Sequence, residues 1–215
     1  VLVNQLGQIS NHVVEKHLQG DTSFTEKAII REALMAISTS IRDPAQQSSY
    51  VQKVLGPVIS AWTHKGMTEV VEDCQKLLLW VGAAPNGTPN YENARALVAV
   101  LDTFRAAIKR VPGGSRGLLP VILPNVFSLC RSLNRLWKPG HAAHAFLRQN
   151  MPKVFAPDQR VAETLLGKKA QQNFEQFIAF WLHNVRDSAY KVIGVSCKIP
   201  DFYNIPNLPN ILNNF

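Results

Sequence analysis

The stretch "LPNVFSLCRSLNRLWKPG", from Leu123 to Gly140, indicates both the fold class and an unusual distribution of charge. Its apolar side chains recur every three or four residues, the spacing that places them on one side of an α-helix. They are Val126, Leu129, Cys130, Leu133, Leu136 and Trp137. At 100° per residue, Arg131, Arg135 and Lys138 gather on roughly the opposite side, with no acidic residue among them. Solvated helix faces normally mix both signs of charge, so this face favours a negatively charged partner.

The lack of acidic residues extends well beyond this stretch. The 55 residues between Asp102 and Asp158, numbered 103–157, contain nine lysines and arginines but neither Asp nor Glu. These cations are Arg105, Lys109, Arg110, Arg116, Arg131, Arg135, Lys138, Arg148 and Lys153. Because the formal charge of the whole chain is +8, the remainder carries almost no net charge. The positive charge is therefore local in the sequence, which favours a local anionic partner.

The overall composition is that of an ordered globular protein. Of the 215 residues, 46% are hydrophobic and 18% are charged, which argues against disorder. The sequence contains no run of eighteen apolar residues and no secretion signal, so we expect no membrane insertion. Cys74, Cys130 and Cys197 are odd in number and widely separated in apolar helical contexts, as is typical of reduced thiols in an intracellular protein. Because the chain begins at Val1 rather than Met, we expect it to be an internal piece of a longer protein.

Helical periodicity also dominates the rest of the sequence, and no segment shows the alternation of a β-strand, so the predicted class is all-α. Helices are expected at about 23–41, 44–62, 67–81, 91–111, 123–137, 141–155 and 169–194. Flexible loops are expected near 83–90 and 111–118, where glycine and proline are frequent.

The spacing of the helices favours a repeat architecture. Helix pairs that begin near residues 24, 67 and 119 are about 43 and 52 residues apart, close to the period of roughly 40–47 residues in HEAT and armadillo arrays. We therefore predict one HEAT-repeat-like α-solenoid of antiparallel helix pairs over 1–215. A compact helical bundle is the competing architecture, although a bundle rarely needs so many long and unequal helices.

Segments of the sequence resemble one protein family. "REALMAISTSI" (31–41) followed by "VLGPVISAW" (54–62) resembles a helix pair of the karyopherin-β superfamily. "LCRSLNRLWKPG" (129–140) and "IPDFYNIPNL" (199–208) resemble the middle section of the exportin-5 family, whose members carry microRNA precursors out of the nucleus. The resemblance runs in the same order from about Ile29 to the end of the chain.

This resemblance implies a function and partners. Exportins of this kind hold a double-stranded RNA stem with a short 3′ overhang (a pre-microRNA) on the inner surface of a solenoid, together with Ran-GTP. The chain itself then needs no cofactor, because Ran carries the GTP. Nucleoporins are further expected partners, and the receptor shuttles between nucleus and cytoplasm. Aligned family arginines give Arg131 and Arg95 as RNA-binding residues.

Charge and helical spacing add Lys109, Arg135 and Lys138 to the expected RNA-binding residues. A-form RNA is recognised mainly through phosphates and 2′-hydroxyls, which requires cations on rigid supports. The three cations of the opening stretch, at i, i+4 and i+7, form a ridge about two helical turns long. Arg95 and Lys109 lie near one line of the preceding helix, with Asp102 between them. If the two helices lie side by side, the two rows form one basic wall.

Other interpretations of these residues remain. The cations could form an ordinary solvated face, and the segment could be a karyopherin scaffold that binds protein cargo, Ran or nucleoporins without RNA contact. Arg105 is expected to pack on the core or pair within the protein. The pair His141 and His144 is expected to start a helix rather than bind metal, because no acid or cysteine is close in sequence. We find no catalytic motif, so the chain is not expected to be an enzyme.

Overall fold

The computed structural model describes residues 22–83, 89–155, 174–200 and 202–204, together with residues 12, 13, 16, 18 and 208. The main helices within these residues are α2 (Phe24–Ser38), α3 (Pro44–Thr63), α4 (Lys65–Glu72), α5 (Cys74–Trp80), α6 (Tyr91–Arg110), α7 (Pro112–Ser115), α8 (Leu119–Leu136), α9 (Ala142–Asn150) and α11 (Phe174–Ser196). Short 3-10 turns follow at Arg116–Leu118, Pro152–Phe155 and Phe202–Asn204. No strand occurs in these described ranges, which confirms the all-α prediction. Within them, none of the helices has both the length and the apolar character needed to cross a membrane.

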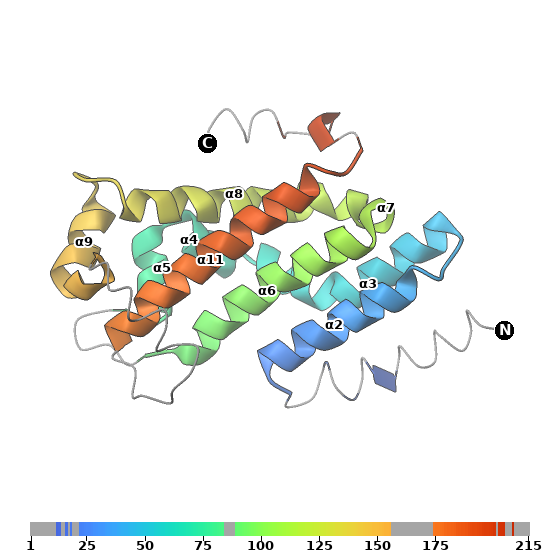
Figure 1. Cartoon of the computed structure of the whole chain (residues 1–215), viewed down its shortest axis with the longest axis horizontal. Coiled ribbons are helices and arrows are strands. Elements are labelled where there is room, and N and C mark those ends of the chain that lie inside the picture. The colour runs from blue at the N-terminus through green and yellow to red at the C-terminus, as the bar shows by residue number, and fades with distance from the viewer. Residues whose placement is uncertain are drawn as a thin grey trace.

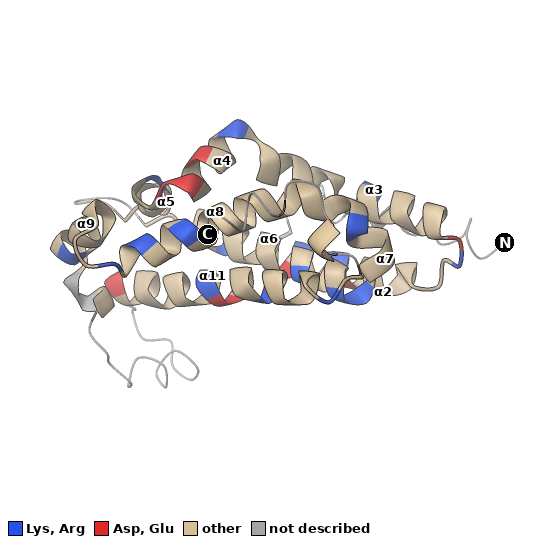
Figure 2. Ribbon diagram, turned by 90° about the horizontal axis from the view of Figure 1, so that it is seen from above, with Lys and Arg blue, Asp and Glu red and all other residues tan. Residues whose placement is uncertain are grey.

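The helices form layers, as expected for a HEAT-repeat-like solenoid of antiparallel pairs. In Figure 1, α2, α6 and α11 form the front layer and run in the same direction, while α3 and α8 return in the opposite direction behind them. Helix α2 contacts both α3 and α6, and α8 contacts α3, α4 and α11. Figure 2 shows α4 on the far side of α8. The helix predicted at 67–81 therefore does not begin a pair in the front layer but packs on the back of α8.

That helix is also divided in two. Asp73 has an extended backbone, and its carboxylate accepts hydrogen bonds from the backbone N–H groups of Gln75 (2.8 Å) and Lys76 (3.3 Å), so it ends α4 and caps α5. The break lets both short helices follow the surface of α8. Ser132 of α8 donates a hydrogen bond to the backbone carbonyl of Val71 at 2.7 Å, which fixes α4 on that surface.

Two buried tryptophans join the layers. The indole N–H of Trp62 in α3 donates to the carbonyl of Ile122 in α8 at 3.0 Å, and its ring packs edge-on against Phe104 of α6. The indole N–H of Trp181 in α11 donates to the carbonyl of Ala94 in α6 at 2.8 Å. Both side chains are buried, and each indole N–H has the hydrogen-bond partner that burial would otherwise deny it.

The connection between α6 and α8 differs from the expected flexible connector. Residues 112–118 form the short helix α7 and a 3-10 turn, and Gly114 and Ser115 are buried. A Cβ atom on Gly114 would lie 3.0 Å from Cγ1 of Val111 and 3.4 Å from Cγ2 of Val51, so the turn packs closely on α3. Helix α8 then begins at Leu119, four residues before the predicted start, with Pro120 in its first turn where no N–H donor is needed. For the loop expected near 83–90, residues 84–88 lie outside the described residues.

Candidate nucleic-acid interface

The three cations predicted in this part of the sequence lie in the C-terminal half of α8 and in the turn after it, and we call Arg131, Arg135 and Lys138 the cationic ridge. Arg131 is half-buried, whereas Arg135 and Lys138 are exposed. Figure 2 shows Lys and Arg segments along this end of α8, with acidic segments on α4. The apolar side of α8 faces the core, which leaves only this narrow face to solvent.

Lys138 does not lie in the helix, although the sequence predicted a continuous ridge on one helix. Helix α8 ends at Leu136, and the N–H of Lys138 donates to the carbonyl of Arg135 at 3.3 Å in the turn that follows. Gly140 completes this turn with a φ of 84°, a conformation that favours glycine. Lys138 thus extends the ridge from the turn between α8 and α9.

The ridge is bordered on one side by α11. The side-chain amide of Asn134 and the hydroxyl of Tyr190 are hydrogen bonded at 3.3 Å, which joins the exposed edges of the two helices. Arg131 donates to the hydroxyl of Ser128, one turn earlier in α8, at 3.0 Å. That bond holds the guanidinium group along the helix.

On the other side, the ridge lies near acidic residues. Arg135 lines a shallow pocket together with Glu72, Asp73 and Cys74 from the junction of α4 and α5. Within the described part of the chain, no ion pair within 4 Å joins Arg135 to either carboxylate. Burial is the main cause that raises the pKa of the Cys74 thiol; Asp73 raises it further and Arg135 opposes the shift, so both charges act on this pocket. The acid-free segment of the sequence therefore lies next to two acidic side chains, Glu72 and Asp73, in the folded structure.

Other cations of the acid-free window pair with carboxylates. Nε of Arg105 lies 3.5 Å from Oδ1 of Asp102, which confirms the expected pairing within the protein. Arg110 of α6 contacts Glu32 of α2 at 3.0 Å, across 78 residues of sequence. Both pairs are partly exposed and each contributes about 0–1 kcal/mol to stability. Their main effect is to neutralise two charges that the sequence counted as free.

The structure does not place Arg95 and Lys109 next to the ridge. Both are exposed on α6, whereas α11 lies between α6 and α8 in Figure 1 and contacts both helices. On the α6 side, the hydroxyl of Ser188 in α11 donates to Asp102 at 3.4 Å. The two rows of cations therefore face different directions, and the single basic wall considered above does not form within these residues.

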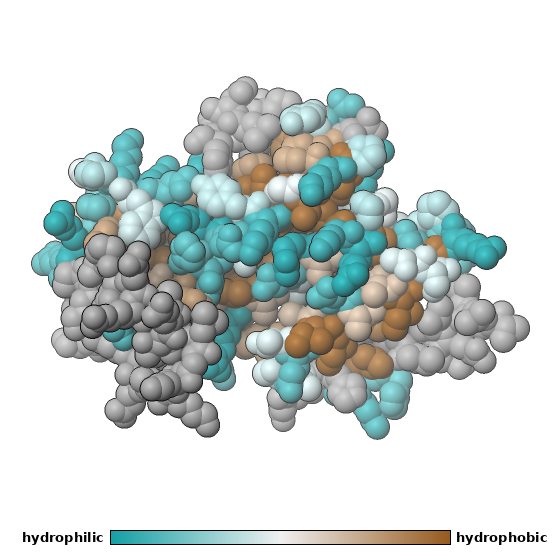
Figure 3. All heavy atoms as spheres, viewed as in Figure 1, coloured by the Kyte–Doolittle hydropathy of each residue, from teal (hydrophilic) through white to brown (hydrophobic). Residues whose placement is uncertain are grey.

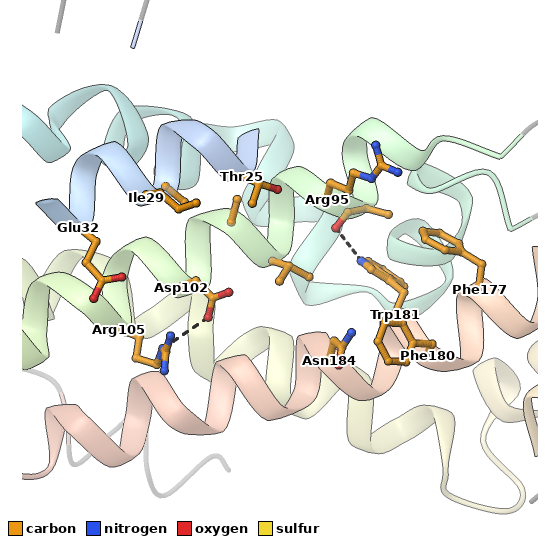
Figure 4. Close-up of a pocket in the computed structure, with 14 residues that line it drawn as sticks. Thr25, Ile29, Glu32, Arg95, Asp102, Arg105, Phe177, Phe180, Trp181 and Asn184 are labelled. Carbon is orange, nitrogen blue, oxygen red and sulfur yellow. Dashed lines mark hydrogen bonds and ion pairs between the residues drawn. The ribbon is translucent and has the colours of Figure 1, made fainter. Parts of the chain in front are cut away.

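A second surface feature lies on the face that carries Arg95, and we call it the front groove. It has a volume of about 390 Å³, with α6 as its floor and with α2 and α11 as its walls. Ile29 from α2, and Phe177, Phe180 and Trp181 from α11, line it (Figure 4). Sequence reasoning missed this groove because its residues come from three helices. The available signal was that Ile29 and Phe180 are large apolar residues that lie outside the buried sets of their helices.

The histidines have structural roles. His141 begins α9 as expected, since its Nδ1 accepts a hydrogen bond from the N–H of Ala143 at 3.2 Å. His144 lies with Nδ1 2.9 Å from the carbonyl oxygen of Leu136 and its ring against Phe155. Among the described residues, no three His, Cys, Asp or Glu side chains are close enough together to hold a metal ion.

Comparisons with known proteins identify the family. The sequence model of the Exportin-5 family matches residues 1–214. The chain is also similar to the curated Exportin-5 of Dictyostelium discoideum, with 22% identity over 236 residues that cover 93% of this chain and 20% of that protein. The chain thus spans about a fifth of the length of this relative. No solved structure matches it significantly. On the strength of the match over nearly its whole length, the chain belongs to the exportin-5 family.

Proposed function

We propose that this chain is a segment of a nuclear export receptor and that its cationic ridge helps to hold double-stranded RNA with a short 3′ overhang, such as a pre-microRNA. Family membership over residues 1–214 is the observation that supports export. The exposed side chains of Arg135 and Lys138 at one end of α8 support the RNA contact. In this proposal Ran-GTP completes the complex and supplies the nucleotide. The receptor contacts nucleoporins as it shuttles between nucleus and cytoplasm.

The geometry of the ridge suits a phosphate backbone. From Arg131 to Arg135 the ridge extends about 6 Å along the axis of α8, at 1.5 Å per residue, and Lys138 continues it from the turn that follows. It thus offers a short row of charges to the backbone of one RNA strand rather than a base-reading surface, as A-form RNA requires. Two or three phosphate contacts are a small part of a complete RNA clamp, so the proposal requires further contacts elsewhere in the full-length protein. Arg95 and Lys109 are not included, because they face another direction.

The front groove favours a second candidate function, a scaffold segment that binds protein. Its lining is largely apolar, and its cation Arg105 is already paired with Asp102, so the groove offers little positive charge to RNA. The two functions occupy different faces, so one does not exclude the other.

The RNA proposal is tested with the full-length protein in which this sequence occurs, in the presence of Ran-GTP. Fluorescently labelled stems with a 3′ overhang, blunt stems and single strands are compared by anisotropy. We expect the overhang stem to bind most tightly, and the double variant Arg131→Ala/Arg135→Ala to weaken its binding about tenfold, from the loss of two charge-assisted contacts.

The matched control removes two cations from the other face, in Arg95→Ala/Lys109→Ala, and should leave RNA affinity unchanged. Circular dichroism should show the same helix content for both variants. Equal binding of all three RNAs, or an unaffected ridge variant, would contradict the proposal and favour the protein-binding scaffold.

A further inference from the structure

We propose that the front groove binds an amphipathic α-helix of a partner protein, with an acidic side chain of that helix paired to Arg95. The apolar face of the bound helix lies against Ile29, Val98 and Phe180. This site is on a different face from the cationic ridge, so the inference does not depend on RNA binding.

The groove between α2 and α11 has a shape that can accommodate one further helix. Helices α2 and α11 both pack on α6, and the exposed side of α6 forms the floor between them. Figure 4 shows side chains from all three helices lining this space. A further helix can pack its side-chain ridges between two flanking helices in the same way that helices pack within proteins.

The lining explains why a partner would be held there. Ile29 is 62% exposed and Phe180 is 43% exposed, on opposite walls of the groove. Figure 3 shows hydrophobic residues open to solvent over α2 on this face. Large apolar side chains that converge on a concave surface mark an interaction site, since their burial removes apolar area from water.

The secondary structure of the walls selects a helix over an extended peptide. All three sides of the groove are continuous α-helices, so their backbone N–H and C=O groups are already hydrogen bonded within each helix. Among the described residues that line the groove, none belongs to a sheet edge that could pair with a strand. An extended peptide would bury its own backbone groups without partners, whereas a helix satisfies them internally.

The charges of the groove define one end of the bound helix. Asp102 pairs with Arg105 and Glu32 pairs with Arg110, so these four charges are balanced. Arg95 forms no ion pair or hydrogen bond with another described residue, and in Figure 4 it lies at the end of the groove opposite Glu32. Because Arg95 has no carboxylate partner among the described residues, an acidic side chain near one end of the bound helix can pair with it.

The test uses a phage library of 16-residue peptides, selected against the full-length protein and counter-selected against its Ile29→Lys variant. We expect the enriched peptides to carry apolar residues at i, i+3 or i+4, and i+7, with an acidic residue near one end. Leu79→Lys is the matched control, because Leu79 is 52% exposed on α5 outside the groove.

The affinity of one enriched peptide is then measured by fluorescence anisotropy. Ile29→Lys should weaken binding about tenfold, as for a central interface residue, whereas Leu79→Lys should have no effect. Arg95→Glu should weaken binding roughly threefold, and exchange of the acidic residue of the peptide for Lys should restore it. The ridge variant Arg131→Ala/Arg135→Ala should bind the peptide normally, which separates this site from the RNA proposal.

Several results would overturn the inference. These are an absence of enriched peptides, enriched peptides without helical spacing, and equal peptide binding by the Ile29→Lys variant. Failure of the charge exchange at Arg95 would overturn the orientation of the helix. Circular dichroism of each variant shows whether the fold is retained, and Phe180→Ser on the opposite wall provides an independent variant of the same site.

Discussion

The cationic ridge and the front groove contain similar numbers of charged residues but arrange them in different ways. On the ridge, the exposed Arg135 lies near Glu72 and Asp73 without an ion pair to either within the described residues. In the groove, the acids are paired with Arg105 and Arg110 around an apolar floor. A charge count along the sequence therefore predicts an electrostatic field only where acids distant in sequence also stay distant in space.

The largest expected effect concerns the two tryptophans that support these surfaces. Trp62 lies under α8 and Trp181 forms part of the α11 wall of the groove, and both are buried and hydrogen bonded. We expect either Trp→Ala substitution to lower the free energy of unfolding by about 3–5 kcal/mol. Trp137 is 37% exposed and packs edge-on against Phe155, so Trp137→Ala should cost only about 1 kcal/mol. Urea denaturation measures all three, and equal losses would contradict this description of the core.

The second prediction uses salt to separate the two faces. Removal of two phosphate contacts in Arg135→Ala/Lys138→Ala should reduce the slope of log affinity for RNA against log salt by roughly 1.5. The paired substitution Arg95→Ala/Lys109→Ala should leave the slope unchanged. RNA titrations of the full-length protein at several salt concentrations give these slopes. If both double variants reduce the slope equally, the RNA contacts both faces and the distinction between them fails.

A smaller effect is expected at the turn that carries Lys138. Gly140 has a φ of 84°, and a Cβ atom there would meet nothing within 4 Å, so only backbone strain opposes a side chain. Gly140→Ala should lower the free energy of unfolding by about 1 kcal/mol, and Gly140→Asn by less. Thermal unfolding measures the change in stability. The affinities for RNA and for the peptide show whether the substitution affects the ridge or the groove. If Gly140→Ala weakened peptide binding and left RNA binding unchanged, this turn would belong to the groove and not to the ridge.

The smallest effect concerns the acids beside the ridge. Glu72 lines the pocket that contains Arg135, so Glu72→Gln should raise RNA affinity two- to threefold, roughly the strength of an exposed charge interaction. The gain should disappear at high salt, because the charges are solvent-exposed. Glu69 lies on the same helix but pairs with Lys76 at 3.5 Å, so Glu69→Gln is the matched control. A decrease in affinity for Glu72→Gln would show that the acid orients Arg135 rather than competing with the RNA.

The sequence predicted the elements that local periodicity determines. The apolar stripes of 91–111 and 123–137 correspond to α6 and α8, and the histidine pair begins α9 as expected. The break at Asp73 was not predicted, because the apolar spacing continues across it although the residue is a good N-cap. The buried turn at Gly114 was also missed, since glycine in a loop and glycine at a close approach look the same in sequence.

The candidate site was harder to predict because it depends on contacts between distant segments. Arg110 meets a carboxylate 78 residues away, and no pattern near either residue indicates this. The exposed faces of α2 and α11 form a groove only because α6 lies between them, which is a property of the packing order. Helical spacing did predict that Arg131 and Arg135 share one side of α8, since that relation is local.

The close contact at Gly114 affects how binding events on the two faces relate to one another. Because this turn packs its backbone closely against Val51 of α3, the connection between α6 and α8 is anchored on a third helix. The helix that carries Arg95 and the helix that carries Arg135 therefore share a common support in α3, and a substitution that enlarges Gly114 would disturb the path of the chain between the two faces.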